Sequence, residues 1–209
     1  MNNRPKYRPG TLDRVLAFFN EIGIPARYEP GATGFTEGVR IERGELMVDP
    51  ACRISVLLHE GAHLAITPKR YRHLMCGNLY AGRREMFRRV GEQGLPPDTP
   101  LYRAVIQSSD PEATAWAFAA GLHLGFSREE IIEDDQYDGD GETIRLALFL
   151  RSYAGINGLA HAGFCALRPG HQLPVWPELA FWTQEVDAEG FASASGEEGH
   201  LNPDSPPIR

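Results

Sequence analysis

The stretch between Asp49 and Pro68 constrains the fold more than any other part of the chain. It opens with Asp-Pro, a pair typical of a helix start, and closes with Thr-Pro, where proline disfavours helical geometry in the residue before it. The sequence ISVLLHEGAHLAI between them is apolar apart from one serine, two histidines and one glutamate. We therefore expect a buried helix over residues 51–66 that carries His59, Glu60 and His63.

The His-Glu-x-x-His spacing predicts a specific chemistry. With 3.6 residues per turn, His59 and His63 lie one turn apart on one helix face and can direct ring nitrogens at one metal ion. Glu60 is displaced around the helix axis, where it reaches a metal-bound water instead of the metal. Two neutral imidazoles suit Zn²⁺, which lowers the pKa of a bound water to about 7. We expect a zinc hydrolase in which Glu60, as general base, takes the water proton and delivers it to the leaving amine.

A catalytic zinc needs a third protein ligand. The candidate is Glu112, in the first turn of a second expected helix (DPEATAWAFAAGL) that opens at Asp110-Pro111. Its small residues allow close packing along the histidine helix. The alternative interpretation of Glu112 is a favourable charge near a helix N-terminus, and Asp110 is interpreted as the N-cap. Three histidines are alternative third ligands, namely His73, His123 and His161.

Peptide hydrolysis also needs a group that stabilises the oxyanion formed in the transition state. Tyr153 and His161, both in the segment SYAGINGLAHAGF, are the candidates for this catalytic role. The alternative for both residues is ordinary packing of a helix flanked by glycines.

These residues together resemble the ImmA/IrrE-type zinc metallopeptidases, a gluzincin group. The matching pieces are GELMVDPACRISVLLHEGAHLAI (44–66) and DPEATAWAFAAGL (110–122). The resemblance implies zinc held by His59, His63 and Glu112, with Glu60 as general base. It also implies an intracellular protease that cleaves a protein or peptide substrate, often a regulator, and a strand at 45–48 that pairs with the substrate backbone.

A basic segment at residues 69–90 lies between the two matching pieces. It holds seven Lys or Arg residues and one acid, Glu85, whereas the whole chain has a net charge of −7. The 48 residues between His63 and Glu112 exceed the usual interval of the family, and we predict an insertion over residues 69–100. We interpret the segment as a solvated helix face, and the alternative is that its arginines at 83–89 help to recruit an acidic substrate.

Two other functions remain as alternatives. Binding of nucleic acid by the basic segment would indicate a SprT-like DNA-associated protease, with His73 as the third ligand. The second is a zincin-fold protein that binds a metal or a partner without turnover. Such a protein would keep its metal, and its binding would not change when Glu60 is replaced.

The predicted fold is α+β, a mostly helical zincin-like domain over residues 1–190. A small antiparallel sheet is expected before the histidine helix, built from residues 26–28 and a hairpin over 39–48 that turns at Arg43-Gly44. The polar segment 191–209, rich in glycine and proline, is expected to be disordered.

Composition excludes several classes of protein. The acidic balance argues against a protein that coats nucleic acid. No apolar run approaches the ~20 residues of a membrane helix, and the first ten residues contain no hydrophobic leader. The three cysteines are widely spaced and fit reduced thiols better than disulfides. We therefore expect a cytoplasmic protein that does not bind membranes.

Overall fold

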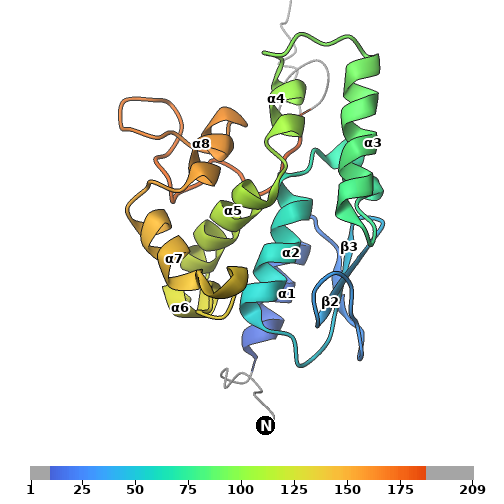
Figure 1. Ribbon diagram of the computed structural model, residues 1–209, viewed down its shortest axis with the longest axis vertical. Coiled ribbons are helices and arrows are strands. Elements are labelled where there is room, and N and C mark those ends of the chain that lie inside the picture. The colour runs from blue at the N-terminus through green and yellow to red at the C-terminus, as the bar shows by residue number, and fades with distance from the viewer. Residues whose placement is uncertain (1–9, 187–209) are drawn as a thin grey trace, which may run out of the picture.

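The computed structural model describes residues 10–186 and confirms an α+β, mostly helical fold (Figure 1). Within that range the strands are β1 (Ala26–Tyr28), β2 (Val39–Glu42) and β3 (Glu45–Val48). The α-helices are α1 (Thr11–Glu21), α2 (Ile54–Ile66), α3 (Leu79–Glu92), α4 (Pro100–Ile106), α5 (Asp110–His123), α6 (Arg128–Ile131), α7 (Gly141–Phe149) and α8 (Ala154–His161). Two 3-10 helices, η1 (Lys69–Leu74) and η2 (Tyr137–Gly139), complete the described range. The predicted tail at 191–209 lies outside it.

Helix α2 lies at the centre of the molecule, with the sheet and α5 on opposite sides of it (Figure 1). Every residue of α2 except His59 and His63 is buried, as expected of a helix that is apolar around its whole circumference. Gly61 allows α1 to pack closely, because a Cβ at this position would lie 2.0 Å from Cζ of Phe19. The sequence alone predicts some close approach at this glycine, and the structure identifies Phe19 as the group that makes it.

The start of α2 differs from the prediction, whereas its end at Ile66 agrees with it. Asp49 and Pro50 form a turn ahead of the helix, in which the Asp49 carboxylate accepts the Ala51 N–H at 2.7 Å. The helix therefore begins at Ile54, three residues later than the prediction. Asp-Pro favours a turn as well as a helix start, and here the side chain of Asp49 satisfies the turn.

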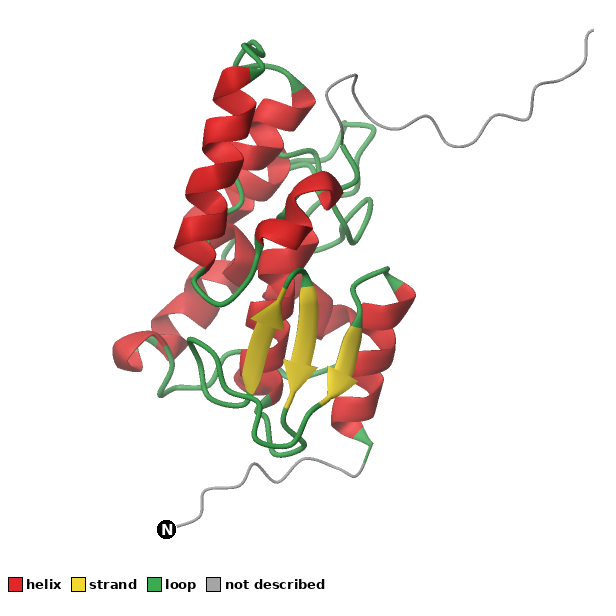
Figure 2. Cartoon of the chain, turned by 90° about the vertical axis from the view of Figure 1, so that its right-hand side faces the viewer, coloured by secondary structure: helices red, strands yellow, loops and turns green. Residues whose placement is uncertain are grey.

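The sheet is mixed, which corrects the prediction of an antiparallel sheet (Figure 2). The hairpin of β2 and β3 is antiparallel as predicted and turns at Arg43-Gly44, where both residues have positive φ. However, β1 pairs with β3 in parallel, so the strand order is β1-β3-β2. The chain leaves β1, crosses to the far edge through residues 29–38, and returns as the central strand.

The central position of β3 bears on substrate binding. A strand with neighbours on both sides has no free edge, so β3 cannot pair with a substrate backbone as the family resemblance implies. The outer edge of β2 is partly covered too, because the Gly77 N–H donates to the carbonyl of Ile41 at 3.0 Å.

The predicted insertion at 69–100 forms η1, α3 and the connection to α4. Helices α3 and α4 project from one end of the molecule (Figure 1). They enclose a hydrophobic cluster separate from the main core, made of Tyr71, Met86, Val90, Leu101, Ala104, Val105 and Val186. Among residues 10–186 no helix combines the length and apolarity needed to cross a bilayer.

Candidate metal centre

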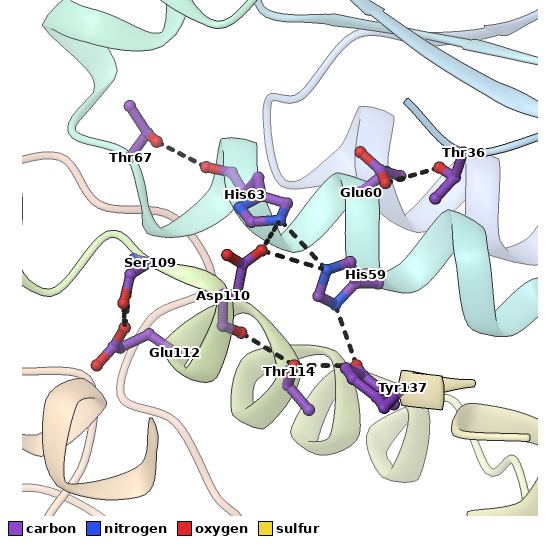
Figure 3. Close-up of polar contacts among 10 residues, drawn as sticks. All are labelled: Thr36, His59, Glu60, His63, Thr67, Ser109, Asp110, Glu112, Thr114 and Tyr137. Atoms are coloured by element: carbon purple, nitrogen blue, oxygen red, sulfur yellow. Dashed lines mark hydrogen bonds and ion pairs between the residues drawn. The ribbon is translucent and has the colours of Figure 1, made fainter. Parts of the chain in front are cut away.

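His59 and His63 project from the same face of α2 (Figure 3). Their Nε2 atoms lie 3.3 Å apart, and the two rings are nearly perpendicular. Their side chains are 18% and 13% exposed, so both rings line a site that solvent can reach. Burial first, and then the neighbouring His63, lowers the pKa of His59 to about 3. His59 is therefore a neutral imidazole, the form that binds metals.

Asp110, the first residue of α5, completes a group of three donors (Figure 3). Its Oδ1 atom lies 3.4 Å from Nε2 of His63 and 3.9 Å from Nε2 of His59. A hydrogen bond from His63 lowers the pKa of the Asp110 carboxyl, so it is ionised. Bonds of about 2.0–2.2 Å from a tetrahedral zinc place ligand atoms roughly 3.3 Å apart. The donor types and separations of His59, His63 and Asp110 fit one such ion.

Glu112, the third ligand predicted from the sequence, is not brought to the histidines. Its Oε2 atom accepts the backbone N–H of Ser109 at 3.2 Å and also bonds the Ser109 hydroxyl, which makes a capping box for α5. Helix α8 covers the carboxylate, because a Cβ on Gly158 would lie 2.0 Å from Oε1 of Glu112. Glu112 is 6% exposed and points away from His59 and His63 (Figure 3).

The sequence contains a signal that separates the two carboxylates. Ser109 and Glu112 form an S-x-x-E pattern before an apolar run, which is the signature of a capping box. That pattern predicts Ser109 as the N-cap and Glu112 as the residue whose side chain accepts the backbone N–H of Ser109. Asp110 then becomes the first helical residue instead of the predicted N-cap, and its carboxylate is left for the histidines.

A chain of hydrogen bonds fixes the orientation of His59. The Thr114 hydroxyl donates to the carbonyl of Asp110 at 2.9 Å, so its oxygen must accept from the Tyr137 hydroxyl, also at 2.9 Å. Tyr137 has then used its only proton and accepts from Nδ1–H of His59 at 3.3 Å. The proton of His59 therefore lies on Nδ1, and the lone pair of Nε2 faces the donor group.

Sequence reasoning missed Tyr137, which lies in η2. Its backbone φ is 55° and that of Asp138 is 60°, a left-handed conformation that costs free energy in residues other than glycine. Burial raises the pKa of the Tyr137 hydroxyl to about 12, so the group stays protonated and can donate. No pattern in the sequence connects Tyr137 with a histidine that precedes it by 78 positions.

Glu60 lies beside the donor group without belonging to it. Its side chain is on the neighbouring face of α2 and is 7% exposed. Oε1 of Glu60 accepts the hydroxyl of Thr36 at 2.7 Å (Figure 3). Thr36 belongs to the connection that crosses from β1 to β2. This connection crosses the sheet because β3 lies between β1 and β2, and the crossing brings Thr36 to Glu60. Within the described chain Oε2 of Glu60 has no protein partner.

A cleft of about 380 Å³ opens in front of these residues. His59, Glu60, His63 and Asp110 line one part of it. The other lining residues come from the 29–38 connection, from Thr67 after α2, from α3 and the segment before it, and from Ser108 and Ser109. The cleft therefore opens directly beside the donor group.

The other candidate residues lie outside the cleft. Tyr153, the N-cap of α8, lies near the donor group: it hydrogen-bonds the Thr114 side chain and interacts electrostatically with Asp110, and burial raises its pKa. His161 is exposed in the last turn of α8, and His73 is exposed in η1. His123 packs its ring against Phe18 and Trp182. Tyr153, His161, His73 and His123 do not line the cleft or join the donor group.

Four of the seven cations of the basic segment have acidic partners within the described residues. Arg88 and Arg89 pair with Glu85, and Arg88 also pairs with Glu92. Lys69 and Arg72 both pair with Glu185. These ion pairs agree with the interpretation of a solvated helix face.

No family model matches the chain, and neither the curated proteins nor the solved structures include a significant match to it.

Proposed function

We propose that the protein is a zinc-dependent peptidase in which His59, His63 and Asp110 hold the metal and Glu60 is the general base. The observation that carries this proposal is the placement of three donor atoms within 4.8 Å of one another, in a cleft that Glu60 also lines. The expected substrate is a protein or peptide. The assignment differs from the gluzincin pattern in its third ligand, which is Asp110 instead of Glu112.

Zinc, when bound, acidifies water and polarises the scissile carbonyl. The protein supplies the other functions. Thr36 holds Oε1 of Glu60, which leaves Oε2 to accept a proton from the attacking water. As the water oxygen bonds to the carbonyl carbon and the C–N bond breaks, Glu60 returns this proton to the leaving nitrogen. Tyr137 and Thr114 keep the His59 ring in the orientation that directs Nε2 at the metal.

A comparison of the wild type with Glu60→Gln tests this function. Degenerate peptide libraries are incubated with each zinc-loaded protein, and products are identified by mass spectrometry. We expect the wild type to cleave peptides, and Glu60→Gln to lose at least about 100-fold of that activity, as removal of a general base does. Glu60→Gln is expected to keep its zinc, because Glu60 is not in the donor group.

Two results would contradict the proposal. Cleavage that is unaffected by Glu60→Gln would remove the general base from the mechanism. A wild type that holds zinc and cleaves nothing would favour a protein that binds a metal or a partner without turnover. The DNA-associated protease stays an alternative, but the ion pairs of Arg88 and Arg89 do not favour it.

A further inference from the structure

The cleft extends from the metal donors along the first two turns of α3. The wall formed there is mainly apolar, with Leu79, Tyr80 and Met86 from α3 and Met75 from the turn before it. Arg83 is the one lysine or arginine among the residues that line the cleft. A single cation in a wall of this composition is suited to selecting one kind of charged group.

Arg83 has no acidic partner in the part of the chain that the structure describes. Its Nε–H is buried without an acceptor, and its guanidinium lies 5.4 Å from the centre of the Phe87 ring. The Nε atoms of Arg40 and Arg103 are also unpaired, but neither residue lines the cleft. The Arg83 side chain is partly exposed, so a ligand carboxylate in the cleft can pair with a guanidinium that has no acidic partner within the described protein.

Arg83 shares the cleft with the metal donors, because Arg83, His63 and Asp110 all line it. A peptide bound at the donor group therefore brings its neighbouring residues past Arg83. A guanidinium binds carboxylates through parallel N–H···O bonds, and its stacking on Phe87 limits the orientations it can adopt.

We propose that Arg83 binds a carboxylate of the substrate and makes the enzyme selective for peptides that carry a negative charge next to the cleaved bond. The carboxylate is an aspartate or glutamate side chain or the free C-terminus of the peptide. Leu79, Tyr80 and Met86 accommodate the methylene groups beside it. This inference rests on the proposed peptidase function for its biological meaning, but binding alone can test it.

The test uses degenerate octapeptide libraries that fix one central residue as Glu or as Gln, each made with a free or an amidated C-terminus. Retention on immobilised zinc-loaded Glu60→Gln protein measures binding, and digestion by the wild type measures cleavage. Arg83→Met removes the charge and keeps most of the length of the side chain. Arg84→Met is the control, because Arg84 is exposed on the same helix and does not line the cleft.

We expect the protein to prefer Glu over Gln, or the free acid over the amide, by about tenfold or more, as hydrogen bonds between charged groups allow. Whichever preference is found identifies the source of the carboxylate. Arg83→Met is expected to abolish the preference and to keep its zinc, and Arg84→Met to change neither.

Equal retention of all four libraries by the Glu60→Gln protein that keeps Arg83 would overturn the inference, as would a preference that survives Arg83→Met. Failure to retain any library would overturn it as well. Charge-selective retention without cleavage would instead contradict the peptidase function and leave the inference intact. Cleavage without charge selectivity would support the peptidase function and overturn the inference about Arg83.

Discussion

Two carboxylates in the first turn of α5 have different roles because they occupy different positions in that turn. Asp110 is the first helical residue, and its side chain extends from the helix start toward His63 at 3.4 Å. The third helical residue, Glu112, reaches back to the N–H of Ser109. A capping box satisfies exposed helix donors, so the free energy of capping holds Glu112 away from the donor group.

At the residue scale, Tyr137→Phe tests the chain of hydrogen bonds to His59. The substitution removes the acceptor for Nδ1–H of His59 and the donor to Thr114. We expect zinc affinity to fall about 10–100-fold, the usual effect of losing a group that orients a metal-binding histidine. Competition with a chromogenic chelator measures this. Tyr102→Phe, in the α4 cluster, is the control, and equal affinities in both variants would exclude the role of Tyr137.

Thr36 is expected to position Glu60. Replacing Thr36 with Val removes the hydrogen bond to Oε1 while conserving the shape of the side chain. A hydrogen bond to a charged group contributes about 1.5–3 kcal/mol, so kcat should fall at least about tenfold. KM and zinc content should change little. Thr36→Ser, which keeps the hydroxyl, should restore kcat, and a serine variant as slow as the valine variant would argue against the contact.

At the scale of elements, the sequence correctly predicted features that depend only on residues close together in the chain. The histidine helix ends at Ile66 as expected, and the hairpin turns at Arg43-Gly44. The parallel pairing of β1 with β3 is non-local, and no spacing in the sequence encodes it. This pairing sends the 29–38 connection across the sheet and brings Thr36 to Glu60. Because the parallel pairing was not predicted, the contact between Thr36 and Glu60 could not be predicted either.

The packing of α1 on α2 leads to a stability prediction. Gly61→Ala places a Cβ 2.0 Å from the buried Phe19 ring. Although alanine is the better helix former by about 1 kcal/mol, overpacking a core costs about 1–3 kcal/mol. We expect Gly61→Ala to lower the free energy of unfolding, measured with urea in the absence of metal.

Gly91→Ala in α3 is the matched control for Gly61→Ala. A Cβ at position 91 meets nothing within 4 Å, so only the helix propensity changes. We expect this variant to be more stable than the wild type by about 0.5–1 kcal/mol. Stabilisation by both substitutions would show that Phe19 moves aside without cost and that the close approach of α1 is not required.

At the scale of the whole molecule, charge is unevenly distributed along the sequence but largely paired in the structure. The basic segment 69–90 stands out in an acidic chain, yet Lys69, Arg72, Arg88 and Arg89 have acidic partners. We expect no binding of duplex DNA in 150 mM salt, measured by fluorescence anisotropy, because the chain is acidic as a whole and more than half of the segment's cations are already paired with acids. Salt-dependent binding that weakens in an Arg84→Met, Arg88→Met variant would support the DNA-associated alternative.

How far the site could be predicted depends on how far apart in the chain its residues lie. His59 and His63 share one helix, so their spacing alone brought them together. The structure places Asp110 of α5 beside them and holds Glu112 in the capping box with Ser109, whereas the sequence analysis interpreted the two carboxylates the other way round. Tyr137 reaches His59 only through the tertiary packing of η2, which no motif encodes.

The most direct test of the central claim is the metal content of four purified proteins by elemental analysis. They are the wild type and the variants His63→Ala, Asp110→Ala and Glu112→Gln. We predict about one zinc per wild-type chain, loss of most of it in His63→Ala and Asp110→Ala, and retention in Glu112→Gln, whose capping role a neutral amide can keep. Zinc retained by Asp110→Ala and lost by Glu112→Gln would contradict the account, as would iron in place of zinc.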